Sequence, residues 1–333
     1  MATTVSSFTA LPDDVLQRVL LGVALDDHDA TAAACRAFRK VIRGPQFPAL
    51  RRRYGFAERG IILVGEGDGE TLEVHVAGKH GAAILIGGLR MTFRGSTTDG
   101  GTRLFVTAMR DSGPPVVLAL DGTSCQWSHF ATLPLHLRNH CIEWHGGRLY
   151  VAGGKGEGYG TFCNHLKAFD ETTGLWEDLP PMSHACAFAA SGVIGNQLFI
   201  AGGVNGVEPY LSTIQIYDFA TRTWRLGATL PHADHGGWGV VVGDGKLYLV
   251  RRPGTTRSMF VYDVESNTWS NQPKPPYQGA DVDVKYAFAH KGRIVAVNTN
   301  GCAFQRGVGS DWSEFDLGVR ASGKVVAGSV ILG

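Results

Sequence analysis

The chain of 333 residues has few charged side chains and no excess of either sign. Asp, Glu, Lys and Arg make up only 18% of it, and the formal net charge is +1. This balance argues against a protein that holds nucleic acid or a membrane surface through its overall field. The sequence also has no apolar run long enough to span a bilayer, and no basic-then-apolar secretory signal at its N-terminus.

Cysteine is scarce and scattered. The six cysteines form no C-x-x-C pair, which makes a zinc site improbable and favours reduced thiols over disulfides. We therefore expect an intracellular protein, in the cytoplasm and/or the nucleus, with no metal and no cofactor. Glycine, in contrast, is abundant at 45 residues. That number suits tight turns between buried strands.

The sequence divides into a helical part, residues 8–54, and a β part, residues 60–333. In the stretch "LPDDVLQRVLLGVALDDHDATAAACRAFRKVI" the apolar residues recur at helical spacing. A second helix is predicted after the acidic cluster at 26–29, ending at Arg43 with Gly44 as its stop. Such short helices make a small core. Some of their apolar surface should be covered by the β part or by a partner chain, and periodicity leaves both open.

The order of residues in this helical part resembles the F-box. The matching residues are Leu11-Pro12-Asp13-Asp14-x-Leu16, then Cys35-Arg36-x-Phe38 and Pro45-x-Phe47. Phe38 stands where the family more often has Trp. In that family the helices bind the Skp adaptor of a cullin-based ubiquitin ligase. The resemblance implies a docking face of Leu11, Pro12, Val15, Leu16, Val19 and Leu20, with Cys35, Phe38 and Val41 shared between that face and the module's own core.

The β part carries a repeat marked by tryptophan. Trp127, Trp176, Trp224, Trp269 and Trp312 are separated by 49, 48, 45 and 43 residues. In the first four units an Asp stands six residues before the Trp, as in "KAFDETTGLW" and "QIYDFATRTW". Each string predicts a strand, a polar turn opened by Asp, and a strand opened by Trp.

A glycine pair ends an earlier strand in two of these units, at Gly153-Gly154 and Gly202-Gly203. Glycine suits a crowded strand end, where a Cβ would clash or a positive φ is needed. About 45 residues a unit, with a glycine pair and a Trp, is typical of a propeller blade. The pattern resembles the kelch repeat and lacks the Gly-His and Trp-Asp signature of the WD repeat.

The five tryptophans predict five blades directly. The strands "GIILVGE" and "LEVHVA" near residues 61–77 and "KVVAGSVIL" at 324–332 are left over. Joined, they would form a composite blade that closes the ring and removes exposed edges. We therefore expect six blades, with five or seven left open by the segment 78–110.

Antiparallel alternation places the loop before the first strand of a blade and the loop after its second strand on one face. The first kind of loop repeats as "LPLHLR", "LPPMSH" and "LPHADH". A ring of basic and polar side chains there would favour an acidic or polar peptide. The candidate target-binding residues are Arg138, His184 and His235, together with Lys155, Tyr159, Asn205, Tyr210 and Arg251 from the second kind of loop.

Catalysis is not expected. The twelve histidines are spread out, and the sequence shows no nucleophile elbow, no P-loop and no metalloprotease motif. The sequence favours a target-recognition subunit of a cullin-type ubiquitin ligase, whose partners are the Skp adaptor, a cullin through it, and an unknown protein target. A non-degradative kelch scaffold, in which the helices only cap the propeller, is the first alternative. A kelch-type metal oxidase is the second.

Overall fold

The structure is a computed structural model, and it describes a defined part of the chain. These residues are 20, 28–34, 36–42, 47, 59–66, 71–76, 79–85, 95–99, 101–109, 113–121, 126–157, 161–208, 210–231, 239–243, 245–250, 259–272, 284–290, 293–298, 303–307, 311–315 and 324–332. None of the helices in these segments is long and apolar enough to cross a membrane.

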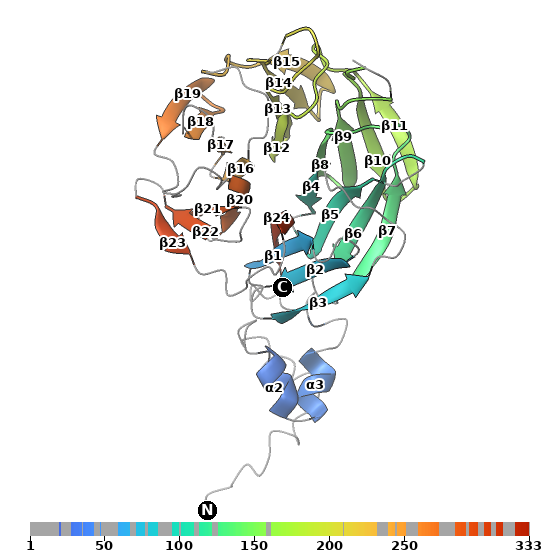
Figure 1. Cartoon of the computed structure of the whole chain (residues 1–333), viewed down its shortest axis with the longest axis vertical. Helices are drawn as coiled ribbons and strands as arrows, with labels where there is room; N and C mark the ends of the chain where they lie inside the picture. Colours follow the sequence, from blue (N-terminus) through green and yellow to red (C-terminus); the bar gives the residue numbers. More distant parts are fainter. Residues whose placement is uncertain are drawn as a thin grey trace, which may run out of the picture.

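Two short helices precede the strands. They are α2 (His28–Ala34) and α3 (Arg36–Ile42), on either side of Cys35. Helix is thus present where the periodicity predicts the second helix. A small cluster of buried side chains holds this part together: Leu20, Ala32, Val41, Ile42 and Phe47. Figure 1 shows both helices outside the ring of sheets.

The strands form six four-stranded antiparallel sheets. Five sheets use four consecutive strands each. Two of them are β4 (Ser96–Thr98), β5 (Arg103–Ala108), β6 (Val116–Asp121), β7 (Gln126–Thr132), and β8 (Cys141–His145), β9 (Arg148–Ala152), β10 (Leu166–Asp170), β11 (Leu175–Leu179). The next is β12 (Ala190–Ile194), β13 (Gln197–Ala201), β14 (Ile214–Asp218), β15 (Thr223–Leu226). The last two are β16 (Gly239–Gly243), β17 (Lys246–Val250), β18 (Met259–Asp263), β19 (Thr268–Gln272), and β20 (Val284–His290), β21 (Arg293–Asn298), β22 (Ala303–Arg306), β23 (Ser313–Phe315).

The remaining sheet joins the two ends of the β part. Its order is β24-β1-β2-β3, from β24 (Lys324–Leu332), β1 (Arg59–Glu66), β2 (Thr71–Val76) and β3 (Lys79–Leu85). Strands β24 and β1 pair antiparallel, with Ile61 opposite Val330. The predicted pairing of the leftover strands is therefore confirmed. The innermost strands contact one another in the closed order β4, β8, β12, β16, β20, β24 and back to β4, around the centre seen in Figure 1.

The repeated Asp opens a hydrogen-bonded turn, as its spacing predicts. One carboxylate oxygen of Asp170 accepts hydrogen bonds from the backbone N–H groups of Thr172 and Thr173, at 2.9 and 3.1 Å. Asp218 does the same two and three residues further on, at 2.9 Å each. The turn then reverses the chain so that the strand opened by Trp pairs with the strand before the Asp. Trp176, for example, lies opposite Phe169.

The repeated Trp joins neighbouring sheets. The indole Nε1–H of Trp176 donates to the backbone oxygen of Thr132 in the preceding sheet at 2.9 Å. Trp224 donates to the oxygen of Pro180 at 2.7 Å, and Trp269 to that of Ala228 at 3.0 Å. These acceptors lie at or just after the end of the outer strand of the sheet before. Each of these three Trp residues thus adds a directed polar contact to an apolar interface.

Aromatic packing fills the same interfaces. The ring of Phe169 lies 5.3 Å from that of Trp176 in its own sheet and 5.3 Å from that of Phe130 in the preceding sheet. Phe169 belongs to a buried cluster that includes Phe105 and Val117 from that neighbour. The Trp and the aromatic residue before the Asp therefore pack between neighbouring sheets at this interface.

We predict that Trp176→Phe lowers the free energy of unfolding by about 1–2 kcal/mol, because it leaves the oxygen of Thr132 without its donor while most apolar contact remains. Denaturant unfolding measures this. Leu226→Ala, at a side chain that is 51% exposed, should change stability by no more than about 0.5 kcal/mol. Equal effects of the two substitutions would argue against the indole bond as a link between sheets.

Candidate target-binding face

The loop before a sheet and the loop after its second strand meet through their backbones. Arg138, before β8, and Lys155, after β9, exchange two N–H to oxygen bonds of 2.8 and 2.7 Å. In the next unit Ala187 and Val204 exchange two bonds of 2.9 Å each. The two kinds of loop therefore lie on one face in both units, as strand alternation predicts.

The glycine pairs make this close approach feasible. Gly203 has a φ of +96°, and a Cβ added there would lie 2.6 Å from the backbone oxygen of Ala187. At Gly153, with a φ of +64°, a Cβ would lie 2.4 Å from the oxygen of Cys186. Both contacts are shorter than carbon and oxygen tolerate, and both φ values belong to the region that glycine enters without strain. The predicted reason for the glycine pairs is confirmed at these two positions.

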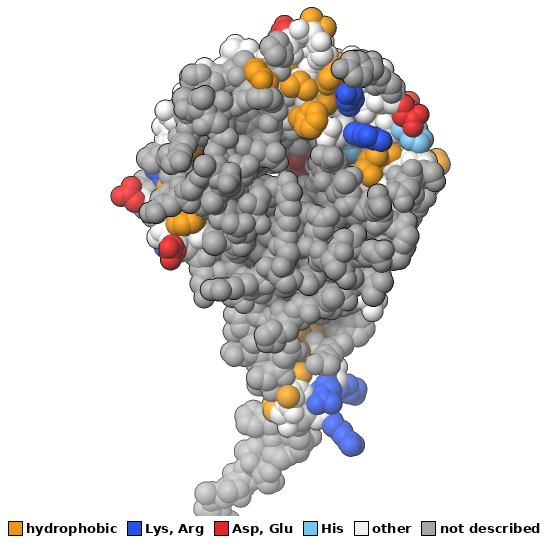
Figure 2. Space-filling view, viewed as in Figure 1, with side chains coloured by type: hydrophobic (Ala, Val, Ile, Leu, Met, Phe, Trp, Pro, Cys, Tyr) orange, Lys and Arg blue, Asp and Glu red, His pale blue; other side chains and the backbone are white. Residues whose placement is uncertain are grey.

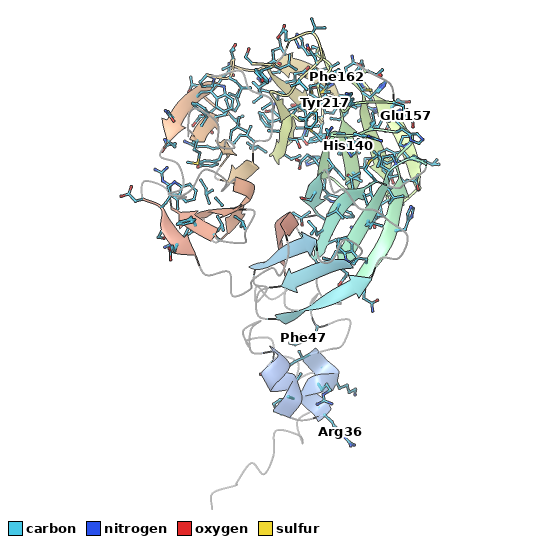
Figure 3. The ribbon with its side chains drawn as sticks, viewed as in Figure 1. Arg36, Phe47, His140, Glu157, Phe162 and Tyr217 are labelled. Carbon is cyan, nitrogen blue, oxygen red and sulfur yellow. The ribbon has the colours of Figure 1, made fainter. Side chains whose placement is uncertain are left out.

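The structure brings some of the candidate target-binding residues together. Arg138 is exposed and directly beside Lys155. The ammonium of Lys155 lies 5.8 Å from the centre of the Phe162 ring. Figure 3 shows Phe162 and Glu157 among the loops of this face. A carboxylate oxygen of Glu157 lies 2.9 Å from Nδ1 of His136, and the Glu157 side chain is exposed.

Other candidates have structural contacts of their own. The backbone N–H and oxygen of His184 are bound by the buried side chain of Gln215, at 2.8 and 3.0 Å. The side-chain oxygen of Asn205 accepts from the N–H groups of Val207 and Glu208, so that it shapes its own loop. Tyr210 is half-buried. The candidates Tyr159, His235 and Arg251 lie outside the described residues.

The candidate adaptor-binding residues are described only in part. Leu20 is 2% exposed and Val41 7%, and both pack in the small core of the helices, against which Phe38 also packs. The burial of Leu20 shows that it supports this core, and its predicted contact with an adaptor stays a prediction. Leu11, Pro12, Val15, Leu16, Val19 and Cys35 lie outside the described residues.

A carboxyl group lies between three of the innermost strands. Glu143 of β8 accepts hydrogen bonds from the hydroxyl of Ser191 on β12 at 2.7 Å and from that of Thr97 on β4 at 3.3 Å. Removal of the carboxyl group from water raises its pKa to about 7, although both hydroxyl donors act the other way. Nearby, burial lowers the pKa of His140 to about 4, so this ring is neutral at pH 7. Its Nε2 lies 3.1 Å from the hydroxyl of Thr107.

No cluster of three or more His, Cys, Asp or Glu side chains suited to a metal ion is present among the described residues. What the face offers instead is hydrogen bonding, exposed charges of both signs and some apolar surface. Sequence reasoning missed one contributor, Phe188, which is 43% exposed and has a φ of +58°. Phe188 lies two residues before β12, and Asn139 lies two residues before β8 and also has a positive φ. The two residues are 49 positions apart, the same interval as between Trp127 and Trp176, so the repeat could have pointed to Phe188.

Comparison with known proteins supports the repeat. The family model of the Kelch motif matches residues 136–183 and 185–231, which contain two of the sheets described above. The chain carries kelch repeats. It forms an all-β propeller of kelch type.

Several kelch proteins are similar to this chain. Human kelch-like protein 34 is 26% identical over 174 residues, which cover 47% of this chain and 27% of the relative. Kelch-like protein 36 of Mus musculus is 26% identical over 160 residues, covering 45% and 26%. The chain thus spans about a quarter of the length of these relatives. A putative F-box/kelch-repeat protein of Arabidopsis thaliana is 25% identical over 295 residues, covering 81% of this chain and 80% of the relative.

We predict that Gly203→Ala destabilises the kelch propeller more than Gly174→Ala. Both glycines have a positive φ, +96° and +70°, but a Cβ at Gly174 meets no atom within 4 Å. The second substitution should cost about 1 kcal/mol of unfolding free energy through φ alone. The first should cost on the order of 3 kcal/mol because it also pushes Ala187 away. Equal costs in denaturant unfolding would show that the backbone approach is not essential.

We also predict a pH dependence from Glu143. Its folded pKa of about 7 exceeds the ordinary value of 4.5, so between these pH values the folded chain holds a proton that the unfolded chain releases. The free energy of unfolding should therefore fall as pH rises from about 4.5 to 7, by at most about 3 kcal/mol. Glu143→Gln should lack this fall while keeping an acceptor for Ser191. Identical pH profiles of the two proteins would mean that Glu143 titrates as an ordinary carboxylate.

Proposed function

We propose that this protein is the target-recognition subunit of a cullin-type ubiquitin ligase. Its N-terminal helices would form an F-box that binds a Skp-type adaptor, and its kelch propeller would capture the protein to be ubiquitinated. The observation that carries the proposal is the similarity to the putative F-box/kelch-repeat protein, which extends over most of both chains.

The arrangement of the helices supports a module of its own. The buried residues of the described helical part, among them Leu20 and Phe47, pack on one another in a single cluster. Among the residues whose side chains the structure describes, none from the sheets belongs to that cluster, and Figure 1 shows the helices outside the ring. A cap on the propeller would instead share its apolar core with the strands. The apolar stripe that the sequence predicts at residues 11–19 would then be available to a partner.

We extend the proposal to the whole ring by taking each of the six sheets as one kelch blade. The family model covers two of them. The support for the others is the closed order of contacts between innermost strands and the pairing of β24 with β1. Closure by a strand from each end of the β part leaves the ring no unpaired edge at that point. It would hold the target-binding face rigid.

No residue of the chain would carry out bond chemistry in this role. The contribution is proximity. A receptor that holds a target beside a charged ubiquitin-conjugating enzyme raises the effective concentration of the target's lysines, as an intramolecular reaction does. The kelch face and the helices would therefore have separate tasks, one toward the target and one toward the ligase.

We predict that Leu16→Asp abolishes co-purification of the full chain with a purified Skp-type adaptor, because a carboxylate would be buried in an apolar interface without a partner. Leu16 is preferable to Leu20, whose burial in the small core means that its replacement would unfold the helices. The matched control is Leu175→Asp on the propeller, at a side chain that is 68% exposed. It should leave adaptor binding unchanged.

Two results would contradict the proposal. If Leu16→Asp binds the adaptor as well as the unaltered chain does, the docking face is wrong. If it lowers the melting temperature of the propeller instead, the helices act as a cap, and the scaffold alternative is favoured. Circular dichroism melting of both variants distinguishes these results from a simple loss of affinity.

A further inference from the structure

Basic residues gather in one segment of the helical part. Between residues 30 and 57 the sequence has seven basic residues and neither Asp nor Glu. The net charge of the whole chain is only +1, so the remainder of the chain is net acidic. The segment includes all of α3, and the acidic residues at 26–29 that precede it have side chains outside the described part. Positive charge is therefore concentrated in the helical part rather than spread over the molecule.

Helix α3 presents three of these charges on one surface. Arg36, Arg39 and Lys40 occupy positions i, i+3 and i+4, which are neighbours on a helix, and all three are exposed. Phe38 and Val41 instead pack in the small core of the helices. Figure 2 shows Lys and Arg side chains gathered on the helical part, below the ring. We call Arg36, Arg39 and Lys40 the α3 basic surface.

The stability of the helix accounts for only part of this arrangement. Arg39 and Lys40 lie in the last turn, where positive charge complements the helix dipole. Arg36 is the first residue of α3, at the end where an acidic residue would be favoured, and the first turn contains none. Like charges at i and i+4, as at Arg36 and Lys40, also repel each other. The position of Arg36 therefore lowers helix stability, and a binding role gives a reason for it.

One member of the surface is held in place before any partner binds. The Nε–H of Arg39 donates to the backbone oxygen of Ala32 at 3.3 Å. Ala32 lies in the last turn of α2, where carbonyl groups lack an N–H partner within their own helix. The bond restricts the Arg39 side chain, so less conformational entropy is lost when its guanidinium meets a carboxylate. A guanidinium and a carboxylate fit each other through charge-assisted hydrogen bonds.

The size of the surface favours an acidic patch on a folded protein over a nucleic acid. Helix α3 has seven residues, which is about 10 Å of helix. A DNA duplex carries one charge about every 1.7 Å along its axis, and proteins that bind it neutralise a run of phosphates. A duplex extending beyond α3 would meet a chain that is net acidic elsewhere. A compact group of Asp and Glu side chains requires only the local positive charge.

We propose that the α3 basic surface binds a cluster of Asp and Glu side chains on the Skp-type adaptor and accelerates association through charge. The surface attracts and orients the adaptor, and the apolar stripe expected at residues 11–19 holds it once bound. The inference rests on the proposed function, because it assigns a second kind of contact to the same partner. Neither Arg39 nor Lys40 is among the residues that carry the resemblance to the F-box.

The test is the association rate of the full chain with an immobilised, purified Skp-type adaptor, measured by surface plasmon resonance at low and high NaCl. The double variant Arg36→Gln, Lys40→Gln removes two charges, introduces good helix formers and keeps the bond from Arg39. We expect its association rate at about 50 mM NaCl to be about tenfold lower than that of the unaltered chain. At about 500 mM NaCl the difference should shrink to about twofold or less, because salt screens exposed charges.

Two controls separate charge from folding. The variant Arg36→Lys, Lys40→Arg exchanges the residue types but keeps both charges, so it should associate at the unaltered rate. Arg225→Gln removes an exposed charge from the propeller and should also leave the rate unchanged. A double variant that has lost its fold would bind poorly at both salt concentrations, and circular dichroism melting identifies it. In that case the unaltered chain decides, because its own association rate should fall as salt rises.

The inference is refuted if salt leaves the association rate of the unaltered chain unchanged, or if the folded double variant associates as fast at low salt. It is also refuted if Arg36 and Lys40 are needed to bind a short DNA duplex but not to bind the adaptor. A chain that binds the adaptor without these dependences keeps the proposed function and loses this inference alone. A chain that does not bind the adaptor at either salt concentration loses both.

Discussion

The organisation of the candidate target-binding face depends on a backbone contact that only glycine permits. Where Gly203 approaches the oxygen of Ala187, the loop after the second strand lies against the loop before its own sheet, and where Gly153 approaches that of Cys186 it lies against the loop before the next sheet. A Cβ at either place would separate them. With the loops in contact, their backbone groups bond to each other, and their side chains project from a common surface. The rigidity of that surface therefore comes from main-chain hydrogen bonds rather than from the polar side chains exposed on it.

The two ends of each sheet have different tasks. At the end opposite this face the Asp turns recur from sheet to sheet, and indole bonds to the preceding sheet, such as that from Trp176 to Thr132, hold neighbouring sheets together. At the face itself, equivalent positions carry different residues, as Asn139 and Phe188 do. A repeated frame with variable loops is the arrangement expected of a recognition protein. The backbone strain at Phe188, with its φ of +58°, can be tolerated because the packed sheets supply the stability.

Burial of ionisable groups near the centre of the ring is a further consequence of the frame. Glu143 has its hydrogen-bond partners on two other sheets, so its pKa depends on how three innermost strands approach one another. Burial also lowers the pKa of His140, because it disfavours the charged form of the ring. At pH 7 His140 carries no charge, and Glu143, with a pKa of about 7, is only partly ionised. The exposed charges of the face are of both signs and come from loop residues such as Arg138, Glu157 and Glu208.

Much of the frame followed from the sequence because its signals are local. The Asp-to-Trp spacing, the glycine pairs and the leftover strands at both ends of the β part predicted the turns, the loop contacts and the pairing of β24 with β1. The sequence could not show that Leu20 packs inside the helical part, that Gln215 binds the backbone of His184, or that Phe188 is held at a positive φ. Each of these depends on groups far apart in the chain that meet only when the sheets or helices are assembled. Local pattern determined the repeat, and tertiary packing decided which side chains remained available to a partner.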